Sequence, residues 1–149
     1  MDAADRFVDR FASSLIDAGW PPMPARVFVT LLASETGRLT AGELAERLGV
    51  SAGAISGAVR ILGTLDVVRR ERSSRRNVYV VDDDVWIATI QARDRLLGRW
   101  ASELEEGIAA VGADTAAGAR LTESRDFFLF LEREMPVLLD RWRDERATR

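Results

Sequence analysis

The chain contains neither cysteine nor histidine among its 149 residues. Without cysteine it has no disulfide framework, no thiolate metal site and no cysteine nucleophile. Without histidine it lacks the commonest metal ligand and general base. No set of acids has the spacing of a carboxylate metal site or of a catalytic pair, and there is no glycine-rich phosphate loop. The sequence therefore predicts no cofactor, no metal and no enzymatic activity.

Long apolar runs are absent as well. No segment approaches the roughly 20 apolar residues that cross a bilayer, and the N-terminal MDAADRF is too acidic for a secretory signal. We therefore expect a cytoplasmic protein with no membrane partner. The length suits one domain, or a small domain with a dimerisation arm.

Charge is distributed unevenly along the chain. The formal net charge is −3, but residues 51–81 hold six arginines against Asp66 and Glu71, a local net charge of +4, so the remainder carries −7. A basic segment on an acidic body is typical of a nucleic-acid-binding lobe.

The segment from Thr40 to Leu65 has the pattern of a helix-turn-helix. Thr40 followed three residues later by Glu43 is a capping-box pattern, which predicts a helix that ends at Gly49. Ser51 is an N-cap candidate for a second helix over about 51–65. The connection between the two helices is short enough for a helix-turn-helix.

Two β-rich runs follow, Val67–Glu71 and Val78–Val81, and an arginine-rich turn separates them. They predict a hairpin, or wing, over about 67–81, with a short strand at Leu39 beside it. Because alternate strand residues point to opposite faces, Arg70 and Arg72 should share one face and Arg69 the other. The whole module, 20–84, is predicted to be a winged helix-turn-helix lobe.

The flanking segments have helical patterns with many apolar residues. An N-terminal helix within 1–19 carries phenylalanines four residues apart, and a helix is expected from Val85 to about Val111. A last helix is expected over about 115–146, interrupted at Pro136. Its centre, 127–131, is apolar around most of its circumference, which favours burial by a partner subunit. We therefore assign 1–19 and 85–149 to dimerisation, in a mainly α fold with a small β-hairpin wing.

The order of these pieces resembles the MarR family of bacterial transcriptional regulators, and within it the GbsR-like branch. The resemblance covers about residues 19–93: GWPPMPARVFVTLL, LTAGELAERLGVSAGAISGAVRIL, VVRRERSSRRNVYVV and DDDVW. Two departures stand out. Asp66-Val67-Val68 replaces the Gly-Leu-Val of many members, and the wing tip Ser73-Ser74-Arg75-Arg76 lacks the usual acid.

The resemblance implies a homodimer that binds double-stranded DNA at a pseudo-palindromic operator, usually as a repressor relieved by a small ligand. The recognition helix would enter the major groove and the wing the minor groove. Arg60 could read guanine or hold a phosphate, and Arg76 could enter the minor groove or pair with an acid. The candidate DNA-contacting residues are Thr40, Ser51, Ala52, Gly53, Ser56, Gly57, Arg60, Arg70, Arg72, Ser73, Ser74, Arg75 and Arg76.

Two alternatives stay open. The chain could be a winged-helix protein-interaction module without DNA binding, although so basic a wing argues against this. The four tryptophans could form an aromatic cage for a cationic effector, but we favour positions in the core or dimer interface for Trp20, Trp86, Trp100 and Trp142. Nothing in the sequence selects the effector.

Overall fold

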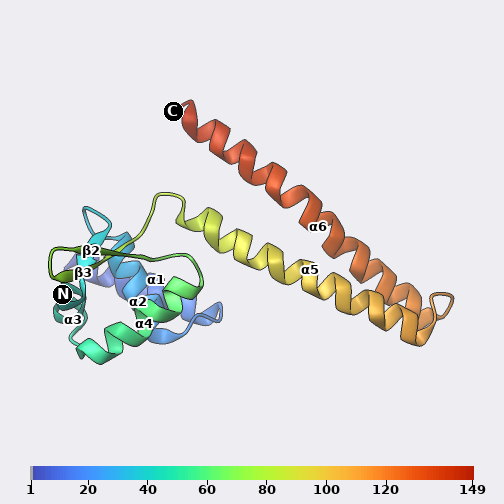
Figure 1. Ribbon diagram of the computed structural model, residues 1–149, viewed down its shortest axis with the longest axis horizontal. Coiled ribbons are helices and arrows are strands. Elements are labelled where there is room, and N and C mark those ends of the chain that lie inside the picture. Colours follow the sequence, from blue (N-terminus) through green and yellow to red (C-terminus); the bar gives the residue numbers. More distant parts are fainter. Residues whose placement is uncertain (1) are drawn as a thin grey trace. The chain divides into compact units, whose positions relative to one another are not determined.

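The computed structural model describes residues 2–149, and it confirms a mainly α fold with a small antiparallel sheet (Figure 1). The described residues form six helices and three strands. They divide into two compact units, a winged lobe that ends at Thr89 and a helical unit that covers Ile90–Arg149. Each unit is described by itself below.

The first two helices of the lobe pack against each other. Helix α1 covers Ala3–Asp17 and begins at a capping box in which Asp2 and Asp5 satisfy each other's backbone N–H groups. Helix α2 covers Pro22–Leu32, and a proline in its first turn is tolerated because those N–H groups have no intrahelical partner. The contact between these helices belongs to the main core of the lobe.

Helices α3 (Ala41–Leu48) and α4 (Ala52–Thr64) form the predicted helix-turn-helix. Thr40 and Glu43 make the expected capping box at the start of α3. Gly49 ends α3 with φ of 64°, a left-handed conformation in which a side chain would be strained. The Ser51 hydroxyl accepts a hydrogen bond from the Ala54 N–H at 3.2 Å and so caps α4. These caps fix the tight turn between the helices.

Three antiparallel strands form the wing in the order β1-β3-β2. Strand β1 covers Arg38–Thr40, β2 covers Arg69–Ser73 and β3 covers Arg76–Val80. The short strand predicted at Leu39 is confirmed, and it pairs with β3.

The prediction of strand residues at Val67 and Val68 was wrong. The Val67 N–H donates to the Leu62 carbonyl at 3.2 Å and the Asp66 N–H to the Gly63 carbonyl at 3.1 Å, a pair of bonds that closes the C-terminal end of α4. Both valine side chains are buried in the lobe core. Because these residues close the helix and fill the core, the pairing of β2 with β3 begins only at Arg69. It continues to Ser73 and Arg76, closer to the tip than predicted.

The core of the lobe lies between its helices and the inner face of the sheet. Its largest fully buried side chains include Phe28 of α2, Leu44 of α3 and Leu62 of α4. The Phe28 ring lies 5.2 Å from Trp20 and 5.5 Å from Trp86, between ring centroids. Two of the four tryptophans therefore pack on this core, as we favoured from the sequence.

The helical unit is an antiparallel pair of long helices. Helix α5 covers Val85–Val111, so its first residues belong to the lobe, and α6 covers Ala116–Ala147. The turn between them needs glycine at position 118, where a Cβ would lie 2.0 Å from the carbonyl oxygen of Gly112. The rings of Trp100 and Phe128 meet across the pair at 5.5 Å.

The predicted interruption of the last helix at Pro136 was wrong, because α6 continues through it. Proline removes the N–H that would bond to the carbonyl of Glu132. Both residues are exposed, so water can hydrate that carbonyl and the helix keeps its other hydrogen bonds. Among the described residues, no helix has the length and apolar character of a membrane span.

Candidate nucleic-acid interface

The predicted recognition surface of α4 is exposed on the lobe. Ile55, Val59 and Leu62 turn inward to the core, and the opposite side of the helix faces solvent. At the N-terminal end this side carries small residues only. The exposed members of the predicted set on and before α4 are Ser51, Ala52, Gly53, Ser56 and Arg60, and Gly57 is half-buried.

Two of the predicted residues also have structural roles. The Thr40 hydroxyl accepts a hydrogen bond from the Glu43 N–H at 3.2 Å, and Thr40 is half-buried at the end of β1. This capping lowers the pKa of Glu43, chiefly through the Thr40 N–H that donates to its carboxylate, with smaller contributions from Arg47 and Arg76. Ser51 caps α4 in the same way as Thr40 caps α3. Both hydroxyls keep a hydrogen atom that can be donated to DNA.

The tip of the wing is a two-residue turn. Ser73 and Arg76 are paired across the ladder, so Ser74 and Arg75 form the connection. Ser74 has φ of 56°, the positive value that short hairpin turns use at their first position. Asp66, at the other sequence departure, also has φ of 56°, so it adopts the left-handed conformation expected there. The wing thus forms without the usual acid at its tip, and Arg75 lies at its end.

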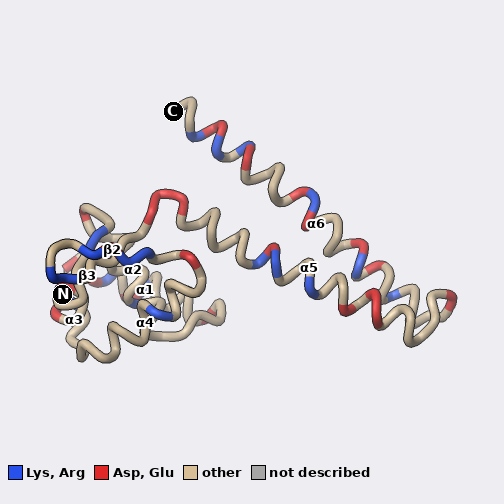
Figure 2. The backbone as a smooth tube through the Cα atoms, viewed as in Figure 1, with Lys and Arg blue, Asp and Glu red and all other residues tan. Residues whose placement is uncertain are grey.

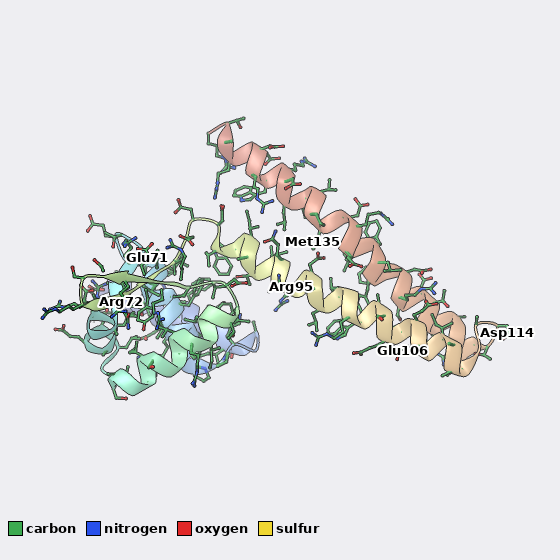
Figure 3. The ribbon with its side chains drawn as sticks, viewed as in Figure 1. Glu71, Arg72, Arg95, Glu106, Asp114 and Met135 are labelled. Carbon is green, nitrogen blue, oxygen red and sulfur yellow. The ribbon has the colours of Figure 1, made fainter. Side chains whose placement is uncertain are left out.

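The strand register sorts the wing arginines by face. Arg69 and Glu71 alternate with Arg70 and Arg72 along β2, so the two pairs point to opposite sides of the sheet. Arg70 is paired across the ladder with Tyr79, a buried residue, and therefore lies on the side that faces the lobe. Figure 3 labels Glu71 and Arg72, the two adjacent residues of β2 that illustrate this alternation.

Arg69 and Glu71 belong to a network of ion pairs that crosses the central strand. Arg69 donates two hydrogen bonds to Asp82, at 2.8 and 3.2 Å, and also pairs with Glu71. Arg38 of β1 reaches the same Glu71 carboxylate from the other edge of the sheet. The Arg69 guanidinium, and after it that of Arg38, lowers the pKa of Glu71, and Arg69 likewise lowers the pKa of Asp82. The two arginines on this face are thus largely neutralised within the lobe.

The remaining arginines of α4 and the wing have no such partners. Within residues 2–149, none of the five side chains takes part in an ion pair, and all are exposed. Figure 2 shows basic segments in the hairpin and acidic residues in the segment that leads to α5. The five are Arg60, Arg70, Arg72, Arg75 and Arg76.

A groove of about 320 Å³ separates α4 from the wing, and we call it the helix–wing groove. Its helical wall is formed by Ser56, Val59, Arg60 and Gly63. Its other wall is formed by Val68, Arg70 and Tyr79. Two guanidinium groups without ion-pair partners in the described chain therefore line one groove. Such a groove attracts anions.

Two family models match the chain. One, described as MarR family, matches residues 18–76, and one described as MmpR5-like MarR family transcriptional regulator matches residues 84–145. The chain belongs to the MarR family of transcriptional regulators. The first match contains α4 and most of the wing, and the second contains most of α5 and α6. Both models describe a family of transcriptional regulators.

Among solved structures, one shares the fold of this chain, and two others resemble it less closely. A structure described as that of a transcriptional regulator has a TM-score of 0.84 at 23% identity and covers 96% of this chain and 99% of its own. MepR, described as a transcription regulator of the Staphylococcus aureus multidrug efflux pump MepA, is 13% identical with a TM-score of 0.45, covering 91% of this chain and 92% of that one. Sco5413 of Streptomyces coelicolor, described as a MarR family transcriptional regulator, is 19% identical with a TM-score of 0.43, covering 89% and 83%. No curated protein matches the chain.

Sequence reasoning missed the partners of Arg69. Asp82 entered the sequence analysis only as part of the DDDVW segment, and Arg38 was given no role. Strand alternation places Arg69 and Glu71 on one face, but that pattern cannot indicate that Arg38 reaches the same carboxylate from 33 residues away. No group of three or more described acids could hold a metal ion.

Proposed function

We propose that this MarR-family protein is a homodimeric, sequence-specific DNA-binding regulator. Helix α4 would enter the major groove, which is roughly 12 Å wide and admits one helix. The small residues at its N-terminal end would allow its backbone to approach the base edges closely. Arg75 at the wing tip would enter the adjacent minor groove, where narrow segments attract arginine. The predicted DNA contacts of Thr40, the α4 residues and the wing belong to this proposal.

The observation that carries the proposal is the sorting of charge on the sheet. On one face Arg38 and Arg69 are paired with Glu71 and Asp82. Of the six arginines in residues 51–81, only Arg69 is paired in this way, and the other five lie on α4 and the rest of the wing, the elements that would contact DNA. If the arginines only kept the hairpin soluble, we would expect no such separation of paired from unpaired side chains. Binding to DNA phosphates explains it, because arginines without acidic partners are available to neutralise phosphates.

A second copy of the chain would complete the regulator. The helical unit exposes many large apolar side chains, which a partner of the same kind would cover. Two lobes related by a two-fold axis would then present their α4 helices about 34 Å apart, one turn of DNA, to the two halves of a palindrome.

Repression, a small-molecule effector and membership of the GbsR-like branch are part of the same proposal. They rest on the resemblance of residues 19–93, and the match of 84–145 to an MmpR5-like model neither requires nor opposes that branch. A ligand would act by favouring a dimer in which the spacing of the lobes does not fit the operator.

Selection of bound sequences from a random duplex library, with the purified full-length protein at a stated salt concentration, tests the proposal. We expect an enriched inverted repeat with half-sites about one helical turn apart. If a folded protein enriches no sequence even at low salt, the interaction-module alternative becomes the better account.

The wing is tested by the double variant Arg75→Ala/Arg76→Ala. We expect the loss of two phosphate or minor-groove contacts to lower operator affinity by at least about 30-fold and to make the salt dependence of binding shallower. The control, Arg10→Ala/Arg120→Ala, removes the same charge from exposed positions on α1 and α6. Equal affinities of the two variants would exclude the wing tip from binding.

A further inference from the structure

We propose that the helix–wing groove is a clamp for a single DNA backbone phosphate, held by Arg60 from α4 and Arg70 from the wing. On this proposal Arg60 contacts the backbone and does not read a guanine. The inference rests on the proposed function, because it assumes that α4 and the wing contact the same duplex. Base reading by α4 and entry of the wing tip into the DNA minor groove give the helix–wing groove no role. The proposed clamp gives it one.

The geometry of DNA determines what must pass over this groove. The major and minor grooves are adjacent, and one sugar–phosphate strand separates them. If α4 lies in the major groove and the wing tip in the minor groove, that strand has to cross the space between the two elements. The helix–wing groove is that space, since residues of α4 form one wall and residues of the wing form the other.

The lining of the groove has the chemistry that a phosphate requires. Arg60 and Arg70 project from opposite walls, and within the described chain neither has a carboxylate partner. A guanidinium offers parallel N–H donors that match two phosphate oxygens, and such charge-assisted hydrogen bonds are strong. Ser56 adds a hydroxyl donor to the helical wall. No acid lines the groove to compete for the arginines.

The space in the groove is also open. A Cβ added at Gly63, on the helical wall, would meet no heavy atom within 4 Å. Ser56, Arg60 and Gly63 lie at positions i, i+4 and i+7, so they form one stripe along α4. The sugar–phosphate strand could therefore follow this stripe without displacing any side chain at position 63.

The position of Arg60 along α4 argues against base reading. Recognition helices contact base edges mainly with their N-terminal residues. Arg60 lies eight residues after the first helical residue, Ala52, or about 12 Å along the axis at 1.5 Å per residue. At that distance from the N-terminus it lines the same groove as Arg70.

The test uses the operator found by selection, in which each phosphate near the predicted crossing is replaced singly by an uncharged methylphosphonate. For the wild-type protein we expect one position at which the replacement lowers affinity about 10-fold or more. In Arg60→Ala and in Arg70→Ala, the same replacement should lower affinity by less than about 3-fold. In each variant one of the two arginines that contact this phosphate has already been removed. Arg72→Ala is the matched control, since it removes an arginine from the same face of β2 and should keep the full effect at that position.

Base preference gives an independent readout. The sequence selected by Arg60→Ala should match that of the wild type at every base pair, whereas loss of a bidentate guanine contact would relax one position. Arg60→Lys should retain part of the affinity, because lysine still binds phosphate as a point charge. The proposal is overturned if Arg60→Ala loses its base preference at one position of the selected sequence. It is also overturned if, at every phosphate, the replacement lowers the affinity of Arg60→Ala and Arg70→Ala as much as that of Arg72→Ala. Failure of the wild type to select any sequence would instead overturn the proposed function.

Discussion

The two units of the chain differ in how much of their apolar surface they bury by themselves. In the winged lobe, Phe28, Leu44 and Leu62 are among several large side chains with no exposed surface. In the helical unit, the buried apolar residues within the described chain are Ala101, Ile108 and Leu139, and two of these are 6% exposed. The same unit leaves Phe127 56% exposed. The lobe therefore resembles an independent domain, and the helical unit resembles half of one.

This difference follows from the geometry of the elements. A lobe of four short helices and a sheet packs elements around one centre, so a side chain can be covered from several directions. An antiparallel pair of helices can cover only the stripes that face each other, and other apolar stripes stay in solvent. Exposed apolar surface on this scale marks an interaction site. We therefore propose that a second copy of the chain covers and stabilises the helical unit.

The largest effect is expected at Phe28, in the lobe. The variant Phe28→Ala would leave a cavity between Trp20 and Trp86 and should lower the free energy of unfolding by about 3–5 kcal/mol. Urea denaturation followed by tryptophan fluorescence measures it. Phe7→Ala is the matched control, because Phe7 in the same lobe is 42% exposed and should lose much less. Similar losses for both variants would contradict a core centred on Phe28.

A second effect is expected where the helical unit is most exposed. Val137 and Leu138 of α6 are 62% and 59% exposed. If a second copy covers them, Val137→Asp and Leu138→Asp, singly or together, would place carboxylates in a dry interface. The dimer dissociation constant should rise by at least about 100-fold, as measured by analytical ultracentrifugation over a range of concentrations.

The matched control for this test is Ser124→Asp, which adds a carboxylate at an exposed polar position of the same helix. It should leave the dissociation constant within a few-fold of the wild type. If the Val137 and Leu138 variants also dimerise normally, the interface lies elsewhere. The contrast between the two units would then need another explanation.

The smallest effect concerns the ion pairs that hold the wing within the lobe. Because Arg69 and Arg38 lower the folded-state pKa of Glu71 below its ordinary 4.5, its ionised form stabilises the fold above the unfolded pKa. That contribution is lost as the pH falls through the lowered pKa. We expect Glu71→Gln to reduce Tm by a few degrees at most at pH 7, since exposed ion pairs contribute little. The difference from wild type should shrink below about pH 4.5 and in high salt.

Calorimetry of both proteins between pH 3 and pH 7 measures this dependence. A constant difference in Tm across that range would show that Glu71 acts through something other than its charge. Glu106→Gln is the control, an exposed acid of α5 outside the network, labelled in Figure 3. Its Tm, measured at the same pH values, gives the effect of removing a carboxylate that lies outside the network.

Local signals in the sequence predicted much of the lobe correctly. The capping patterns at Thr40 and Ser51 set the starts of α3 and α4, because a side chain that satisfies the first N–H groups acts within a single turn. Gly49 marked the end of α3 for an equally local reason. The two errors have different causes, tertiary packing at the valines and an exposed site that tolerates proline in α6. Val67 and Val68 have strand propensity but fill the core, and Pro136 lies inside a helix that the rest of α6 supports.

Patterns along the chain were therefore enough to predict the order of the elements, the winged helix-turn-helix and its concentration of arginine. Which of those arginines lack an ion-pair partner became clear only from the packing of the folded lobe. Arg69 is neutralised by Glu71 and Asp82, while Arg60 and Arg70 line a groove without partners in the described chain. This is because an ion pair can form only between side chains that the strand order brings close together. The order β1-β3-β2 brings Arg38 and Asp82 to the same face, and residue spacing along the chain does not encode that order.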